Sequence, residues 1–103
     1  MEEKIKISKA KYVELCKEAC NNFEPTGDRK KDEEKLLFRV CGLVFGYLEE
    51  PLELIPAGDL IYTYYYNLQQ LILNRQSEPY DSLHTPSKFI LDTLNKAYET
   101  NIR

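Results

Sequence analysis

Apolar residues recur at steps of three and four positions along four stretches of this chain, which is the spacing of one face of an α-helix. No stretch shows the strict two-residue alternation of a half-buried strand. The 103 residues fit a single domain, residues 1–103. Because the segments between the stretches are short, neighbouring helices should run antiparallel. The pattern therefore predicts an all-α fold, an antiparallel four-helix bundle, with helices at about residues 8–22, 28–50, 58–74 and 86–100.

Residues that start helices stand at the beginnings of these stretches. Ser8 can cap the first helix, and Ile7 and Tyr12 then occupy the two positions of a hydrophobic staple. Thr85 is placed to cap the last helix, with Pro86 at the first helical position. Local chemistry is therefore expected to set where the first and the last helix begin.

The second stretch has the widest apolar surface. Its apolar residues cover an arc of roughly 220°, more than the 100° or so of a helix that meets a single neighbour, so we expect it to be the most buried helix. Gly42 and Gly46 lie on its one face that is not apolar. Each costs the helix about 1 kcal/mol relative to alanine, so this face is either approached closely by another helix or is neutral surface. The connection at 51–58 should fold three apolar residues back over the core, namely Leu52, Leu54 and Ile55.

Charge and hydropathy exclude several classes of protein. Lys and Arg number 14 and Asp and Glu 17, giving a net charge of −3, whereas nucleic-acid binders depend on clustered cations. No apolar run approaches the roughly 18 residues that span a bilayer, and the N-terminal residues lack the apolar core of a signal peptide. Three cysteines without framework spacing suit a reducing compartment. We therefore expect a soluble, cytoplasmic protein with no nucleic-acid partner and no membrane span.

The sequence offers few groups for catalysis or for binding a cofactor. His84 is the only histidine, so a Ser–His or Cys–His pair would have to use it, and its place just before a helix is typical of a solvated loop residue. The glycines form no phosphate-binding loop, and the acidic cluster of Glu49, Glu50 and Glu53 is typical of plain surface. We predict that the chain is not an enzyme and has no catalytic or cofactor-binding residue.

The cysteines raise the question of a metal site. Cys16, Cys20 and Cys41 together with His84 would make a Cys₃His set for zinc. Structural zinc ligands, however, come as closely spaced pairs in loops or at element ends. These cysteines instead occupy the centres of apolar stripes, where cysteine behaves as a small hydrophobic residue. We therefore predict core packing and no metal.

The outer side of the third helix suits a protein partner. With its apolar stripe facing inward, this helix places Tyr62, Tyr66, Gln69 and Leu73 on its outer side. Exposed tyrosines give a partner contact area at low entropic cost. The alternative is that the neighbouring loop at 76–84 covers them, with its apolar residues Tyr80 and Leu83.

A family likeness is carried by the central span, residues 40–71, which reads VCGLVFGYLEEPLELIPAGDLIYTYYYNLQQL. A helix ends in an aromatic-Leu-Glu pattern at 47–49, an apolar loop with Pro and Gly follows, and the next helix opens with Leu-Ile at 60–61 and continues with tyrosines. With four helical segments and a length near 100, the chain resembles the immunity proteins of pediocin-like (class IIa) bacteriocins, the enterocin A immunity group. The likeness covers roughly residues 36–98.

The resemblance implies an antiparallel four-helix bundle without enzymatic activity, which stays in the cytosol and protects a bacterium from its own pore-forming bacteriocin. Such proteins act at the inner face of the membrane, on the complex of the bacteriocin with its receptor, the mannose phosphotransferase permease. Their C-terminal half governs which bacteriocin is recognised. Many members are basic, whereas this chain is acidic, so attraction to anionic lipid is not expected. In the C-terminal half our candidate partner-binding residues are Tyr62, Tyr66, Gln69, Leu73, Tyr80, Asn101 and Ile102.

A second interpretation needs no toxin. A small helical adaptor or regulatory protein would bind a soluble protein partner through the tyrosines of the third helix. The other surface open to it is the face of Gly42 and Gly46, and such an adaptor would act as a monomer or as a homodimer. The immunity interpretation leads because the central span supports it, and the adaptor interpretation stays open.

Overall fold

The computed structural model of the chain describes residues 3–101, and the side chains of residues 3–99. Between residues 3 and 101 the chain forms four helices and no strand, so the all-α prediction is confirmed. The predicted ends agree with the observed ends to within three residues. The helices are α1 (Lys9–Ala19), α2 (Arg29–Tyr47), α3 (Leu60–Arg75) and α4 (His84–Asn101).

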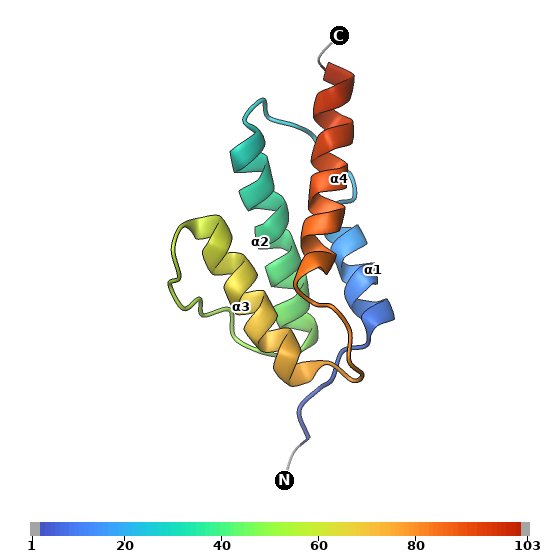
Figure 1. Cartoon of the computed structure of the whole chain (residues 1–103), viewed down its shortest axis with the longest axis vertical. Coiled ribbons are helices and arrows are strands. Elements are labelled where there is room, and N and C mark those ends of the chain that lie inside the picture. The colour runs from blue at the N-terminus through green and yellow to red at the C-terminus, as the bar shows by residue number, and fades with distance from the viewer. Residues whose placement is uncertain (1–2, 102–103) are drawn as a thin grey trace.

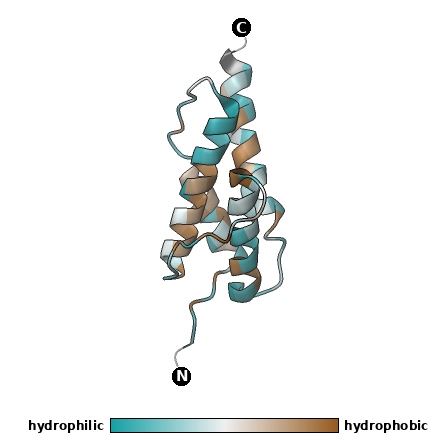
Figure 2. Cartoon of the chain, turned by 90° about the vertical axis from the view of Figure 1, so that its left-hand side faces the viewer, coloured by the Kyte–Doolittle hydropathy of each residue, from teal (hydrophilic) through white to brown (hydrophobic). Residues whose placement is uncertain are grey.

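The most enclosed element is α2, as the width of its apolar arc predicts. It packs against α1, α3 and α4, and α1 also packs against α4 (Figure 1). Its opening turns are hydrophilic and its lower half is apolar (Figure 2). Phe38 is an exception to the predicted arc, because half of its surface is exposed. The buried apolar core is Ile7, Tyr12, Leu15, Cys16, Ala19, Leu36, Leu37, Val40, Cys41, Val44, Phe45, Leu48, Tyr64, Leu68, Ile72, Ile90 and Leu94.

The directions of the helices differ from the antiparallel prediction at two of the packed pairs, α2–α3 and α1–α4. In Figure 1, α1 and α4 rise while α2 and α3 both descend. Contacts between α2 and α3 agree: the ring of Phe38 lies 6.0 Å from that of Tyr64, and Arg75 donates to the carbonyl of Leu48. Later residues of α2 thus meet later residues of α3, and the pair is parallel. The antiparallel arrangement expected from short connections therefore does not apply to this pair.

The parallel pair is possible because residues 48–59 carry the chain back along α3 before the helix begins. The amide side chain of Asn67 binds both backbone polar groups of Ile55. It accepts from the Ile55 N–H at 2.9 Å and donates to the Ile55 carbonyl at 3.0 Å. Leu54 packs on the core as predicted, but Leu52 and Ile55 are exposed. For Ile55 the reason is that its backbone, rather than its side chain, is fixed to α3.

The start of α1 follows the predicted local chemistry, and α2 begins with a side-chain cap of the same kind. The Ser8 hydroxyl accepts a hydrogen bond from the N–H of Lys11 at 3.1 Å, and Ile7 and Tyr12 are fully buried. The hydrophobic staple is confirmed. Asp28 caps α2 through its carboxylate, which accepts from two N–H groups of the first turn.

The ends of α1 and α2 come three residues earlier than predicted. Helix α1 stops at Ala19 because Asn22 adopts a left-handed φ of 57°, and α2 stops at Tyr47 because Glu49 adopts a φ of 55°. Left-handed residues commonly end helices, but the usual one is glycine. Neither left-handed residue is a glycine, so the sequence did not mark these helix ends. The predicted ends at Asn22 and Glu50 therefore lie three residues too far along the chain.

The start of α4 also differs in detail. The Asp81 carboxylate accepts hydrogen bonds from the N–H groups of Leu83 and His84, at 3.0 and 3.3 Å. The helix therefore begins at His84, and Thr85 is not its cap. Pro86 still lies in the first turn, where a missing N–H leaves no intrahelical bond unmade.

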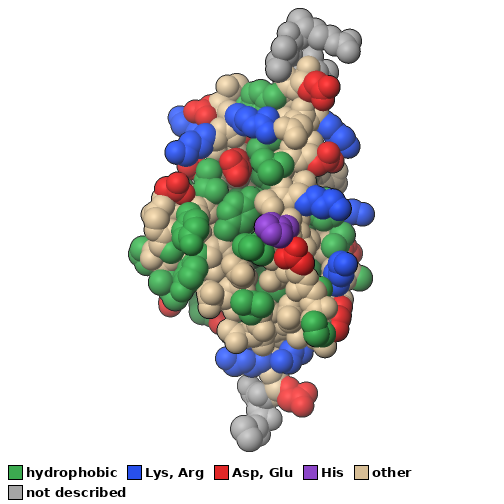
Figure 3. Space-filling model, in the orientation of Figure 1, with side chains coloured by type: hydrophobic (Ala, Val, Ile, Leu, Met, Phe, Trp, Pro, Cys, Tyr) green, Lys and Arg blue, Asp and Glu red, His purple; other side chains and the backbone are tan. Residues whose placement is uncertain are grey.

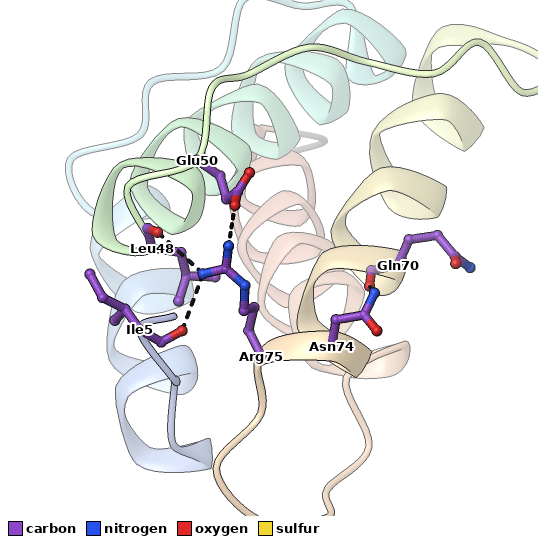
Figure 4. Close-up of polar contacts among 6 residues, drawn as sticks. All are labelled: Ile5, Leu48, Glu50, Gln70, Asn74 and Arg75. Carbon is purple, nitrogen blue, oxygen red and sulfur yellow. Dashed lines mark hydrogen bonds and ion pairs between the residues drawn. The ribbon is translucent and has the colours of Figure 1, made fainter. Parts of the chain in front are cut away.

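The buried side chain of Arg75 joins three segments at the lower end of the molecule (Figure 4). Its guanidinium donates to the carbonyls of Ile5 and Leu48, at 3.2 and 3.4 Å, and forms an ion pair with Glu50. The backbone N–H of Ile7 also donates to the carbonyl of Arg75 at 2.8 Å. The segment before α1 is thereby fixed to the ends of α2 and α3.

Candidate binding face

A shallow apolar hollow lies between α3 and the start of α4. Within the described chain α3 packs against α2 but not against α4. Side chains of α3 and of the start of α4 therefore flank a gap. The gap encloses about 240 Å³. Figure 3 shows His84 among hydrophobic side chains on this face of the molecule. We call it the α3–α4 hollow, and its lining is Tyr62, Tyr65, Leu83, His84 and Ser87.

Four of the predicted partner-binding residues lie along one side of α3. Tyr62 is 60% exposed and Leu73 is 52% exposed, whereas Tyr66 and Gln69 are half-buried. The loop at 76–84 brings Leu83 beside Tyr62 without covering it. The tyrosines were expected either to be exposed or to be covered by the loop at 76–84, and Tyr62 is exposed.

The other three predicted residues do not join this face. Tyr80 is half-buried, its ring lies 6.1 Å from that of Tyr12, and its hydroxyl donates to the carbonyl of Ile7. Tyr80 thus helps to fix the segment before α1. Asn101 ends α4, but its side chain and all of Ile102 lie outside the described residues.

Sequence reasoning missed most of the lining of the hollow. Tyr65 belongs to the run of tyrosines but was not among the residues predicted to face outward, and His84 was expected to be a solvated loop residue. The sequence does not show that α3 and α4 are not packed against each other. That separation depends on the path of residues 48–59, which connect α2 to α3. The period of α4 offered one signal, because His84 and Ser87 are three residues apart on one helical face.

Tyr65 lines the hollow, but its hydroxyl is a buried polar group without a partner among the described residues. Burial raises the pKa of Tyr65, and the nearby Glu33 carboxylate raises it further, so the phenol stays protonated and its O–H remains a donor. A buried hydroxyl without a partner costs about 1–3 kcal/mol.

The size of the hollow limits what it can accept. Sites for small molecules enclose roughly 300 to 1,000 Å³, so about 240 Å³ is smaller than that range. It matches one or two side chains of a larger partner. The exposed Tyr62 and Leu73 would extend the contact along α3.

The cysteines are poorly suited to act as nucleophiles. Burial raises the pKa of Cys16 and of Cys41 to about 12, so both thiols are protonated at neutral pH, and it is the thiolate that reacts. Cys16 and Cys41 lie in the core, as predicted, and Cys20 is half-buried. No group of three or more metal-binding side chains lies close together in the described part of the chain.

Comparisons with protein-family models, with curated proteins and with solved structures find no match to this chain. The likeness to bacteriocin immunity proteins therefore rests on the pattern in residues 36–98. No helix among residues 3–101 is both long and apolar enough to cross a bilayer.

Proposed function

We propose that the chain is a non-catalytic binding protein whose partner docks over the α3–α4 hollow, and that its role is bacteriocin immunity. In this role it protects a bacterium from a pore-forming class IIa bacteriocin. Two features support the proposal: the pattern of residues 40–71 and the four-helix, all-α fold.

The observation that carries the binding role is the exposed aromatic surface beside an apolar hollow. Tyr62 offers its ring to solvent at the rim of the hollow, and Leu83 and His84 line the opposite wall. Tyrosines in partly desolvated hollows are enriched among the residues that dominate interface energies.

The proposed partner is the complex of the bacteriocin with its membrane receptor, a sugar permease, on the cytosolic side. The chain works there as a cytoplasmic protein, peripheral at the inner face of the membrane. Its net charge of −3 gives no attraction to anionic lipid, so protein contacts must supply the affinity. The absence of a catalytic step is part of the proposal, and the protonated Cys16 and Cys41 thiols support it.

A protection assay tests the proposal. The chain is expressed in a bacterium sensitive to class IIa bacteriocins, and a panel of these peptides is titrated. We expect a selective rise in the inhibitory dose for one or a few peptides. A Tyr62→Ala/Tyr66→Ala double variant should lose protection while keeping its helical circular dichroism. The control is Ile55→Ala, because Ile55 is 62% exposed and lies outside the hollow.

A helical adaptor that binds a soluble protein is the second candidate. The parallel α2–α3 pair favours it, because the immunity family implies an antiparallel arrangement. Unchanged sensitivity to every peptide, with folded protein present in the cells, would replace the immunity role by the adaptor role. Unchanged protection in the Tyr62→Ala/Tyr66→Ala variant would instead overturn the assignment of the surface.

A further inference from the structure

A second hollow lies between α1 and the first turns of α4, next to the α3–α4 hollow, with which it shares His84. We call it the α1–α4 hollow. Val13 of α1 and Phe89 of α4 give it an apolar lining, and both side chains are half-buried. It encloses about 230 Å³, again less than the roughly 300 to 1,000 Å³ of a small-molecule site. The hollow therefore suits one large side chain of a larger partner.

Three exposed lysines surround this apolar lining. Lys9 and Lys88 line the hollow itself, and the ammonium group of Lys17 lies 5.9 Å from the centre of the Phe89 ring. None of these lysines forms an ion pair within the described part of the chain. Their charges are therefore available to a partner.

Carboxylates near the hollow are already engaged elsewhere. Asp81, which also lines it, accepts hydrogen bonds from two N–H groups at the start of α4. Glu78 accepts from the backbone N–H of Lys9 at 2.9 Å, and Asp92 forms an ion pair with Lys96 at 3.3 Å. The hollow is therefore locally positive, although the chain as a whole carries a net charge of −3.

We propose that the α1–α4 hollow binds an acidic segment of a partner protein. An aromatic or large aliphatic side chain of that segment enters between Val13 and Phe89, and carboxylates on either side of it meet Lys9 and Lys88. Such a segment is complementary to the hollow in both hydropathy and charge, whereas a basic segment is repelled by the same lysines. The site uses no residue of α3, so the proposal does not rest on the immunity role.

The chain itself contains an acidic segment with an exposed apolar residue. Residues 49–53 hold three glutamates, and Leu52 among them is 37% exposed. This segment lies on the opposite side of the molecule from α1 and α4 (Figure 1). Copies that joined through it would meet head to tail, and such contacts build open chains unless the rotation closes a ring. A separate partner is therefore the occupant we propose.

Titration with synthetic peptides tests the proposal. The probe is acetyl-Glu-Glu-Phe-Glu-Glu-amide, and its binding to the isotope-labelled full chain is followed by the NMR shifts of backbone amides. We expect saturable shifts at Val13 and Phe89 with peptide up to millimolar concentration. Replacing the Phe of the peptide by Ala should weaken binding by roughly tenfold or more, because the buried apolar area is lost. Replacing its four Glu by Lys should abolish binding.

Charge reversal in the protein locates the site. Lys9→Glu and Lys88→Glu should each weaken binding of the acidic peptide by roughly tenfold, which is about 1.4 kcal/mol. Lys9 begins α1, where a glutamate is favoured by the helix dipole, so unfolding would not explain its loss of binding. Lys30→Glu is the matched control, because Lys30 is exposed in the first turn of α2 and does not line the hollow. It should bind the peptide like the unaltered chain.

Four results would overturn the proposal. The first three are no saturable shift at Val13 and Phe89, equal binding of the acidic and the basic peptide, and equal losses in Lys30→Glu and Lys88→Glu. The fourth comes from sedimentation equilibrium of the chain alone, which should show a monomer. Self-association that is abolished by Glu53→Lys would show that the acidic segment of another copy fills the hollow instead of a separate partner.

Discussion

The hydroxyl of Tyr98 in α4 donates a hydrogen bond to the carboxylate of Asp32 in α2, across 66 positions of sequence. The same carboxylate accepts from the backbone N–H of Thr26 at 3.1 Å and from its hydroxyl at 2.7 Å. The Tyr98 oxygen in turn accepts from the N–H of Gly27 at 3.1 Å. Asp32 is fully buried, so these donors replace the water that its charge would otherwise bind.

The first prediction concerns the pH dependence of stability. Burial of Asp32 acts to raise its pKa, but hydrogen bonds from Tyr98 and Thr26 outweigh burial and lower the pKa below its usual 3.8. The carboxylate therefore adds stability above about pH 4, which is lost as pH falls through the lower pKa of the folded state. Asp32→Asn should cost about 1–3 kcal/mol at pH 7, and this difference should shrink below pH 4.

Urea unfolding followed by circular dichroism at several pH values measures this effect. The control is Asp92→Asn, because the Asp92 side chain is 65% exposed and its ion pair with Lys96 lies on the surface. The free energy of unfolding of that variant should stay close to that of the unaltered protein at every pH. Equal losses for Asp32→Asn at pH 7 and pH 3 would contradict the role assigned to its charge.

The second prediction concerns the Arg75 junction. Arg75→Met removes the donor shared by two carbonyls and by Glu50, and should lower the free energy of unfolding by about 3 kcal/mol. Amide exchange at Ile7, whose N–H binds the carbonyl of Arg75, should accelerate more than exchange in the middle of α2. Arg29→Met is the matched control, because that guanidinium is exposed and its one side-chain partner among the described residues is Asn95. Equal effects of the two variants would argue against a special role for the junction.

The third prediction separates stability from binding in the α3–α4 hollow. Tyr65→Phe removes a buried hydroxyl that has no partner among the described residues, so unfolding should require about 1 kcal/mol more. Protection in cells should be unchanged, because the buried hydroxyl does not reach the surface of the hollow. Tyr62→Phe, at an exposed position, should leave stability unchanged. A Tyr65→Phe variant that is less stable would show that the hydroxyl is satisfied in solution.

The fourth prediction compares two glycines by thermal unfolding at low protein concentration. Gly42→Ala should stabilise the single copy by about 1 kcal/mol, because its Cβ meets nothing within 4 Å. Gly27→Ala should destabilise it by about 1 to 2 kcal/mol, because Gly27 has a φ of 97°. Destabilisation by both would mean that α2 is packed more tightly on its outer face than described.

Local patterns predicted the helices well and their assembly less well. Ser8 and the staple of Ile7 with Tyr12 were predictable because a helix start depends on neighbouring residues. The left-handed turns at Asn22 and Glu49 were not, since they lack the glycine that usually marks a helix end. The parallel α2–α3 pair depends on Asn67 binding the backbone of Ile55, a contact that no periodicity announces.

The candidate site was predictable only on one side. Tyr62 and Leu73 follow from the period of α3, because an outward position on a helix is set by residues three and four apart. The opposite wall, at Leu83 and His84, requires knowledge of where α4 stands. Asp32 shows the same limit: it lies in the charged opening turn of α2, yet Tyr98 encloses it from a distant helix.

The attachment of Ile7 to Arg75 also sets an order of events during synthesis. The two residues are 75 − 7 = 68 positions apart, so at roughly 5–20 residues per second a ribosome needs about 3 to 14 seconds to make the second after the first. Helix α1 can form in about a microsecond, but the segment before it must wait for the end of α3. Ile7 is therefore synthesised early but is among the last residues to form its native hydrogen bond.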